Sequence, residues 1–166
     1  YGAAIYGQKN NIRNFDSFGS ILVEKESSFT FLQPLSKYND MAKFETMERG
    51  KARDGDRCIL GLDVGSTTTK AVVIRTEDNS ILGSVYLYTN GNPVRASRQC
   101  YEELLKQIPE NINIVGLGAT GSGRQIAGLH ALTDGVINEI VAHATAAVYF
   151  DPGVDTIFEI GGQDAK

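Results

Sequence analysis

The stretch that decides the fold is Cys58–Lys70, CILGLDVGSTTTK. An apolar run ends in Asp63 and is followed by a glycine, four hydroxyl-bearing residues and a lysine. A second apolar run, Ala71–Ile74, comes directly afterwards. Because β-branched residues favour strands, this pattern predicts a strand, a tight polar turn and a second strand.

The polar turn has the chemistry of a phosphate-binding loop. Gly65 allows a tight turn and a close approach of the backbone to a ligand. Lys70 adds a positive charge, and Asp63 is a hard oxygen ligand that suits Mg²⁺, directly or through water. The turn N–H groups and four hydroxyls can donate to phosphate oxygens, and these belong to Ser66, Thr67, Thr68 and Thr69. An ordinary β-hairpin with a polar turn is the competing interpretation.

Two better-known phosphate motifs do not match this stretch. A Walker A loop requires GxxxxGK[ST], which is absent. A Rossmann fingerprint requires GxGxxG at the start of a helix, whereas a β-branched run follows here.

A second segment, Val154–Lys166 (VDTIFEIGGQDAK), repeats the pattern. An apolar run ends in Glu159, and Gly161, Gly162 and Asp164 follow. Two such turns could face each other across a cleft and hold the phosphate chain of one nucleotide. The alternative is two unrelated strand ends, because Gly-Gly is common in turns.

Four segments in order resemble the ATPase activators of 2-hydroxyacyl-CoA dehydratases and the related benzoyl-CoA reductase ATPase subunits. These proteins belong to the superfamily of acetate and sugar kinases, chaperone ATPases and actin. The segments are DVGSTTTK (63–70), GATGSGRQ (118–125), NEIVAHATAA (138–147) and EIGGQDAK (159–166). The resemblance covers about residues 58–166. It implies an α/β fold: a ribonuclease-H-like half-domain with a βββαβαβ mixed sheet flanked by helices.

The resemblance also implies a site for ATP or ADP with Mg²⁺. Asp63 and Glu159 would be the catalytic residues, which hold Mg²⁺ and position the attacking water. The nucleotide-binding residues would be Gly65, Ser66, Thr67, Thr68, Thr69, Lys70, Gly121, Gly123, Arg124, Gly161, Gly162, Gln163 and Asp164. The family couples ATP hydrolysis to electron transfer, which implies a dehydratase or reductase partner of the same type and a homodimer.

Two positions depart from the family pattern. The simple members share a [4Fe–4S] cluster at the dimer interface, with two cysteines from each subunit. Ala142 stands where the first of these cysteines is found, and alanine cannot ligate iron. The second position would lie beyond Lys166, so we expect no iron–sulfur ligand in this chain. Glu159 stands where aspartate is usual and adds one methylene to the side chain.

Composition is that of a globular protein, with 166 residues of which 42% are apolar and 22% charged. The net charge is −4, and residues 58–166 carry seven basic and twelve acidic side chains, which argues against nucleic-acid binding. No apolar run reaches the roughly 20 residues that span a membrane. Cys58 and Cys100 form neither a disulfide framework nor a CxxC pair, and reduced structural thiols suit the cytoplasm.

The composition predicts a division near residue 57. Residues 1–57 would be an N-terminal extension, or the end of a preceding domain plus a linker at Lys51–Arg57, with a small hairpin of residues 21–23 and 29–32. Residues 58–166 would be the first half of an ATPase domain. Because the other half supplies the adenosine contacts, we expect this segment alone to bind ATP weakly and to be inactive.

Hydrophobic periodicity predicts the elements from residue 58 onwards. Strands are expected at 58–64, 69–76, 81–89, 112–117 and 154–160, and helices at 94–107, 122–129 and 136–150. Ser122 would cap the second helix, and the third would be the longest. Glu139 and His143 lie four residues apart on it, which fits a metal pair, an acid–base pair or a surface salt bridge.

Three functions remain open from the sequence. The leading one is an ATP-binding and hydrolysing activator module that drives a redox partner. The second is a small-molecule kinase of the same superfamily, although no convincing substrate base is found. The third is a nucleotide sensor or scaffold that does not hydrolyse ATP.

Overall fold

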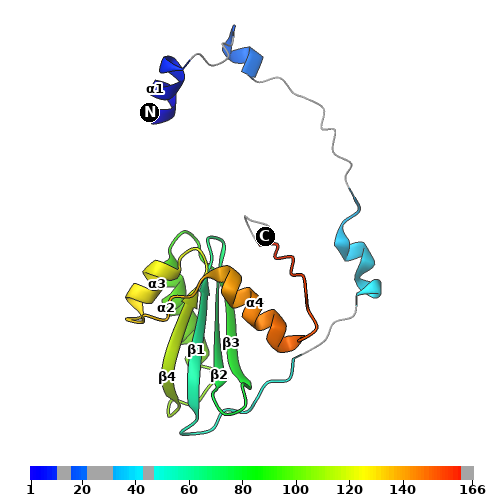
Figure 1. Ribbon diagram of the computed structural model, residues 1–166, viewed down its shortest axis with the longest axis vertical. Coiled ribbons are helices and arrows are strands. Elements are labelled where there is room, and N and C mark those ends of the chain that lie inside the picture. The colour runs from blue at the N-terminus through cyan, green and yellow to red at the C-terminus, as the bar shows by residue number, and fades with distance from the viewer. Residues whose placement is uncertain (11–15, 22–31, 43–46, 162–166) are drawn as a thin grey trace. The chain divides into compact units, whose positions relative to one another are not determined.

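The computed structural model describes residues 1–10, 16–21, 32–42 and 47–161 (Figure 1). The chain divides into two compact units, Tyr1–Glu45 and Thr46–Lys166. The first unit contains α1 (Gly2–Lys9) and the 3₁₀-helices η1 (Phe18–Ile21) and η2 (Leu35–Met41). The predicted small hairpin falls mostly on residues outside the described ranges. Among the described helices, none has the length and apolar character needed to cross a membrane.

The second unit is built on a four-stranded sheet in the order β3-β2-β1-β4. Its strands are β1 (Arg57–Val64), β2 (Thr68–Arg75), β3 (Ile81–Tyr88) and β4 (Asn113–Thr120). The first three form an antiparallel meander, and β4 runs parallel to β1. These strands lie within one or two residues of the predicted start positions, and the predicted α/β mixed sheet is confirmed.

The hydrophobic core lies on one face of this sheet. Alternate residues of β1 are buried, from Cys58 to Val64, and they meet Cys100 and Leu104 of α2 (Pro93–Leu105). The side-chain oxygen of Asn92 accepts a hydrogen bond from the Arg95 N–H at 3.0 Å and caps α2. Helix α3 (Arg124–His130) packs on the same side, but Gly123 precedes it without a side-chain cap, so the predicted Ser122 cap is wrong.

Helix α4 (Glu139–Phe150) lies over the opposite face (Figure 1). A cavity of about 670 Å³ separates it from the sheet and is lined by Ile59, Val72, Tyr86 and Ala142 among others. None of the α4 side chains is buried, and the helix has 12 residues against 13 in α2. The prediction that this helix is the longest is therefore wrong, although its position along the chain is right.

The predicted strand at 154–160 does not form in the described part of the chain. A strand requires a neighbouring backbone edge, and residues 133–137 already occupy the outer edge of β4. The Ala119 N–H donates to Gly135 O at 2.8 Å, and the Ile137 N–H donates to Ala119 O at 2.8 Å. Residues 154–159 instead follow α4 as irregular chain, with Phe158 84% exposed. Within the described residues of this segment, only Ile160 is in a β-bridge, and the others pair with no strand.

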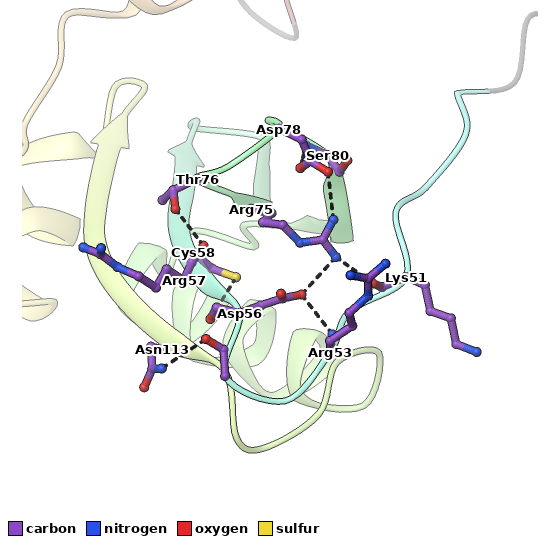
Figure 2. Close-up of polar contacts among 11 residues, drawn as sticks. Lys51, Arg53, Asp56, Arg57, Cys58, Arg75, Thr76, Asp78, Ser80 and Asn113 are labelled. Carbon is purple, nitrogen blue, oxygen red and sulfur yellow. Dashed lines mark hydrogen bonds and ion pairs between the residues drawn. The ribbon is translucent and has the colours of Figure 1, made fainter.

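A polar cluster ties residues 50–56 to the base of the sheet (Figure 2). The Arg75 guanidinium donates to Asp56 Oδ2 at 2.9 Å, to Asp78 Oδ2 at 2.9 Å and to Lys51 O at 2.7 Å. The Gly50 N–H also donates to Ile81 O at 2.9 Å. The structural division therefore falls after residue 45, whereas composition placed it near residue 57, because the charged segment predicted as a linker contributes to the sheet unit.

Candidate functional site

Asp63 and Lys70 face each other at the end of the β1–β2 hairpin. The antiparallel register makes them direct cross-strand partners, and Lys70 Nζ lies 2.9 Å from Asp63 Oδ2. The same ammonium lies 5.7 Å from the centroid of the Tyr86 ring, within cation–π range. Asp63 Oδ1 is buried and accepts no hydrogen bond from the described residues. A buried carboxylate oxygen that accepts no hydrogen bond from the protein is suited to bind a metal ion or an ordered water.

The turn between the two strands has the predicted tight form. The Gly65 N–H donates to Thr68 O at 2.9 Å, and a Cβ on Gly65 would lie 2.9 Å from the same oxygen. Ser66 and Thr67 are exposed at its tip. The turn therefore presents both residues to a ligand that approaches its tip.

Thr69 differs from the other three predicted hydroxyl donors. Its side chain is completely buried, and its Oγ1 lies 2.9 Å from Thr89 Oγ1. Thr89 Oγ1 in turn donates to Gly65 O at 2.8 Å. This chain of hydrogen bonds supports the turn from the core side. Thr89 was missed from the sequence, because a threonine directly after a strand carries no motif of its own.

The predicted glycine segment lies directly against the end of β1. Gly121 has φ +89°, and a Cβ there would lie 2.5 Å from both Asp63 Oδ1 and Val64 O. The Gly123 N–H donates to Val64 O at 2.7 Å. Arg124 Nη1 donates to Gly121 O at 3.1 Å and so closes this turn. The structure therefore brings two of the predicted motifs together around Asp63.

Glu159 lies elsewhere. Its Oε1 is 4.0 Å from His143 Nε2, and it lines a hollow of about 220 Å³ against α4. The residues around this hollow and those around the cavity beside Asp63 do not overlap. The structure thus does not bring Glu159 and Asp63 into one site, and the joint Mg²⁺ role stays a prediction. Gly161 is exposed, and Gly162, Gln163 and Asp164 lie outside the described residues.

Neither cysteine is placed to bind metal or to react. Cys58 and Cys100 have no exposed surface. Burial raises the pKa of the Cys100 thiol to about 11 and also raises the pKa of Cys58. Since the thiolate is the metal ligand and the nucleophile, both residues act as core side chains at neutral pH.

Comparison with known proteins agrees with this geometry. The sequence profile of the BadF/BadG/BcrA/BcrD ATPase family matches residues 60–166. The (R)-2-hydroxyglutaryl-CoA dehydratase activating ATPase of Acidaminococcus fermentans is 32% identical over 107 residues, which are 64% of this chain and 40% of that protein. The activator of lactoyl-CoA dehydratase of Anaerotignum propionicum is 36% identical over 110 residues, again 64% and 40% of the two proteins.

A solved structure shows the same likeness. The activator of the 2-hydroxyisocaproyl-CoA dehydratase from Clostridium difficile with bound ADPNP matches with a TM-score of 0.51 and 31% identity, over 65% of this chain and 39% of that chain. The chain spans between 26% and 41% of the length of the curated relatives it matches. Since the profile match takes in the sheet, the hydroxyl turn and the glycine segment, the chain belongs to the BadF/BadG/BcrA/BcrD ATPase family.

Proposed function

We propose that this chain supplies a phosphate-binding half of an ATP-dependent activator. The observation that carries the proposal is the buried Asp63 Oδ1, which lies beside Lys70 and beneath Gly121. The ADPNP in the C. difficile relative supports a nucleotide as the ligand. We place the phosphate chain at the turn tip, where Ser66 and Thr67 are exposed.

Each residue of the hairpin then has a defined task. Lys70 donates to phosphate oxygens, and the turn hydroxyls add further donors, which stabilise negative charge on the transferring phosphoryl group. Asp63 would hold Mg²⁺, directly or through water, and would orient the attacking water. When bound, the ion would neutralise charge on the phosphate oxygens. Gly161, Gly162, Gln163 and Asp164 remain our proposal for the opposite side of the nucleotide. Glu159, which the sequence predicts as a second carboxylate there, lines the separate hollow against α4 and is not assigned a task at the phosphate turn.

The output of hydrolysis is proposed from the relatives. Those named above are activators of 2-hydroxyacyl-CoA dehydratases, and we propose a partner of that type, a homodimeric assembly and a cytoplasmic location. The residues present do not fit an iron–sulfur cluster within the described ranges. Ala142 has no ligand atom, and both cysteines are buried in the core. The proposed function therefore includes no electron transfer through an iron–sulfur cluster held by these residues.

The test is Mg-ATP hydrolysis by the intact protein, purified without oxygen, beside its Asp63→Asn variant. We expect turnover to fall roughly 100-fold or more, which is typical of the loss of a group that stabilises transition-state charge. Asp78→Asn is the matched control, because it removes a carboxylate at the β2–β3 turn, 47% exposed and bonded to Arg75. Turnover in Asp63→Asn equal to that of the control would contradict the proposal.

One observation favours a second candidate, a nucleotide sensor that does not hydrolyse ATP. Glu159 and Asp63 line separate hollows, so the described arrangement holds one acidic group at the phosphate turn. ATP binding without phosphate release, lost in Asp63→Asn, would select this function over the first.

A further inference from the structure

A second cluster of potential ligands lies on α4, outside the phosphate site. Glu139 and His143 stand one helical turn apart, and Glu159 reaches them from the segment after the helix. His143 Nε2 lies 4.0 Å from Glu139 Oε1 and 4.0 Å from Glu159 Oε1. One ligand atom from each of the three residues lies within 4.8 Å of the others, and all three side chains are partly buried.

The sequence around α4 explains how the Glu159 carboxylate comes to lie beside this helix. Asn138 caps α4, because its Oδ1 accepts a hydrogen bond from the Ile140 N–H at 2.9 Å. At the other end Asp151 Oδ1 accepts from the Gly153 N–H at 3.0 Å and forms a turn. The chain then runs back beside the helix (Figure 1), and Ile157 joins Ile140 in the wall of the hollow that Glu159 lines.

We propose that Glu139, His143 and Glu159 bind a divalent transition-metal ion, with Zn²⁺ as the best fit. One imidazole and two carboxylates form the mixed nitrogen and oxygen ligand set that Zn²⁺ accepts, whereas Mg²⁺ and Ca²⁺ prefer oxygen alone. With a neutral imidazole the three side chains carry two negative charges, which a divalent cation balances.

The distances permit such a site with small side-chain movements. In tetrahedral geometry, two ligand atoms at about 2.0–2.2 Å from an ion are about 3.3–3.6 Å apart. The two 4.0 Å separations exceed that range by less than about 1 Å, and the 4.8 Å limit exceeds it further, so rotation of the side chains has to bring the three atoms together. The hollow of about 220 Å³ leaves room for a water or a small ligand on the ion. Three protein ligands with an open position are typical of reactive zinc sites.

The test uses the intact protein, freed of metal with a chelator and kept without nucleotide. Co²⁺ is titrated as the visible probe of the ligand geometry, and Zn²⁺ is titrated by calorimetry. We expect one ion per chain, with Zn²⁺ displacing Co²⁺ and millimolar Mg²⁺ failing to do so. Glu139→Gln and His143→Gln should each weaken Zn²⁺ binding about tenfold to 100-fold or more, as losses around metal ligands do.

Two matched variants distinguish this site from Zn²⁺ binding elsewhere on the protein. His130→Gln removes the exposed histidine of α3 and should bind Zn²⁺ as the parent does. Asp63→Asn should also keep Zn²⁺ binding, so failure of the ATPase proposal and failure of the metal proposal give different results. Circular dichroism checks that each variant is folded. Zn²⁺ affinity unchanged in both Glu139→Gln and His143→Gln, displacement by Mg²⁺, or no stoichiometric binding by the parent would overturn the proposal.

Discussion

Gly121 decides how closely the glycine segment approaches the end of β1. Its φ of +89° belongs to the left-handed region, and the space where a Cβ would stand is taken by Asp63 Oδ1 and Val64 O. Conformation and contact both require glycine here. The same contact covers the carboxylate that we assign to Mg²⁺.

Gly121→Ala is expected to damage both stability and nucleotide binding. The strained backbone alone costs about 1–3 kcal/mol. The added methyl group would also push against Asp63, with only 2.5 Å between its position and Oδ1. Urea unfolding and binding of a non-hydrolysable ATP analogue measure the two effects separately.

Gly91→Ala is the matched control for this substitution. Gly91 also has a positive φ, +69°, but nothing lies within 4 Å of its Cβ position. It should lose stability through the backbone alone and bind the analogue normally. Equal losses of analogue binding in the two variants would show that crowding at Asp63 has no effect.

Among the secondary-structure elements, β2 is fixed at its end by Arg75. Its guanidinium holds the pKa of Asp56 below the ordinary value. The Ser80 N–H donates to Asp78 and, with Arg75, lowers the pKa of that carboxyl as well. Carboxyl groups with lowered pKa values stabilise the fold above their ordinary pKa, and this contribution disappears as the pH falls through the folded value.

Asp56→Asn should therefore weaken the fold at neutral pH and reduce its sensitivity to acid. The parent is expected to lose stability as the pH falls below about 4, the range where carboxyl groups of lowered pKa take up protons. Urea unfolding at a series of pH values measures the slope. Asp54→Asn removes the neighbouring exposed carboxyl and serves as control. An acid slope in Asp56→Asn as steep as in the parent would contradict this role.

The sequence predicted the elements well where a local pattern determines them. Alternation of apolar residues located β1, β2 and β3, and the hydroxyl turn located Asp63 and Lys70. The same pattern at 154–160 gave a wrong strand, because a local pattern does not reveal which segment the fold places beside a strand edge, and at Ala119 of β4 that segment is Val136. The contacts of Thr89 and Glu159 were equally out of reach, since both depend on segments brought together by the fold.

At the scale of the whole sheet unit, the two cysteines lie in one shared hydrophobic core, so their reactivity depends on the opening of that core. Cys58 lies in β1 and Cys100 in α2, and neither has exposed surface. Burial is the main cause of both raised pKa values. A thiol reagent can therefore modify these cysteines only after the core opens and the thiols ionise.

We expect a thiol reagent to modify Cys58 and Cys100 at the same slow rate under native conditions. That rate should rise with urea in step with global unfolding, because sheet and helix open together. Mass spectrometry of the labelled peptides follows each cysteine separately. Rapid labelling of one cysteine in the absence of urea would show that α2 and β1 separate locally.

The parallel pairing of β1 with β4 imposes an order on folding. Short turns join β1, β2 and β3, so their pairing closes small loops, whereas the pairing of Arg57 with Asn113 must enclose β2, β3 and α2. Loop closure costs more entropy as the loop grows, and non-local parallel pairs form slowly. We expect the meander to form while β4 is still being synthesised. The phosphate site, completed by Gly121 at the end of β4, is then among the last parts of the sheet unit to assemble.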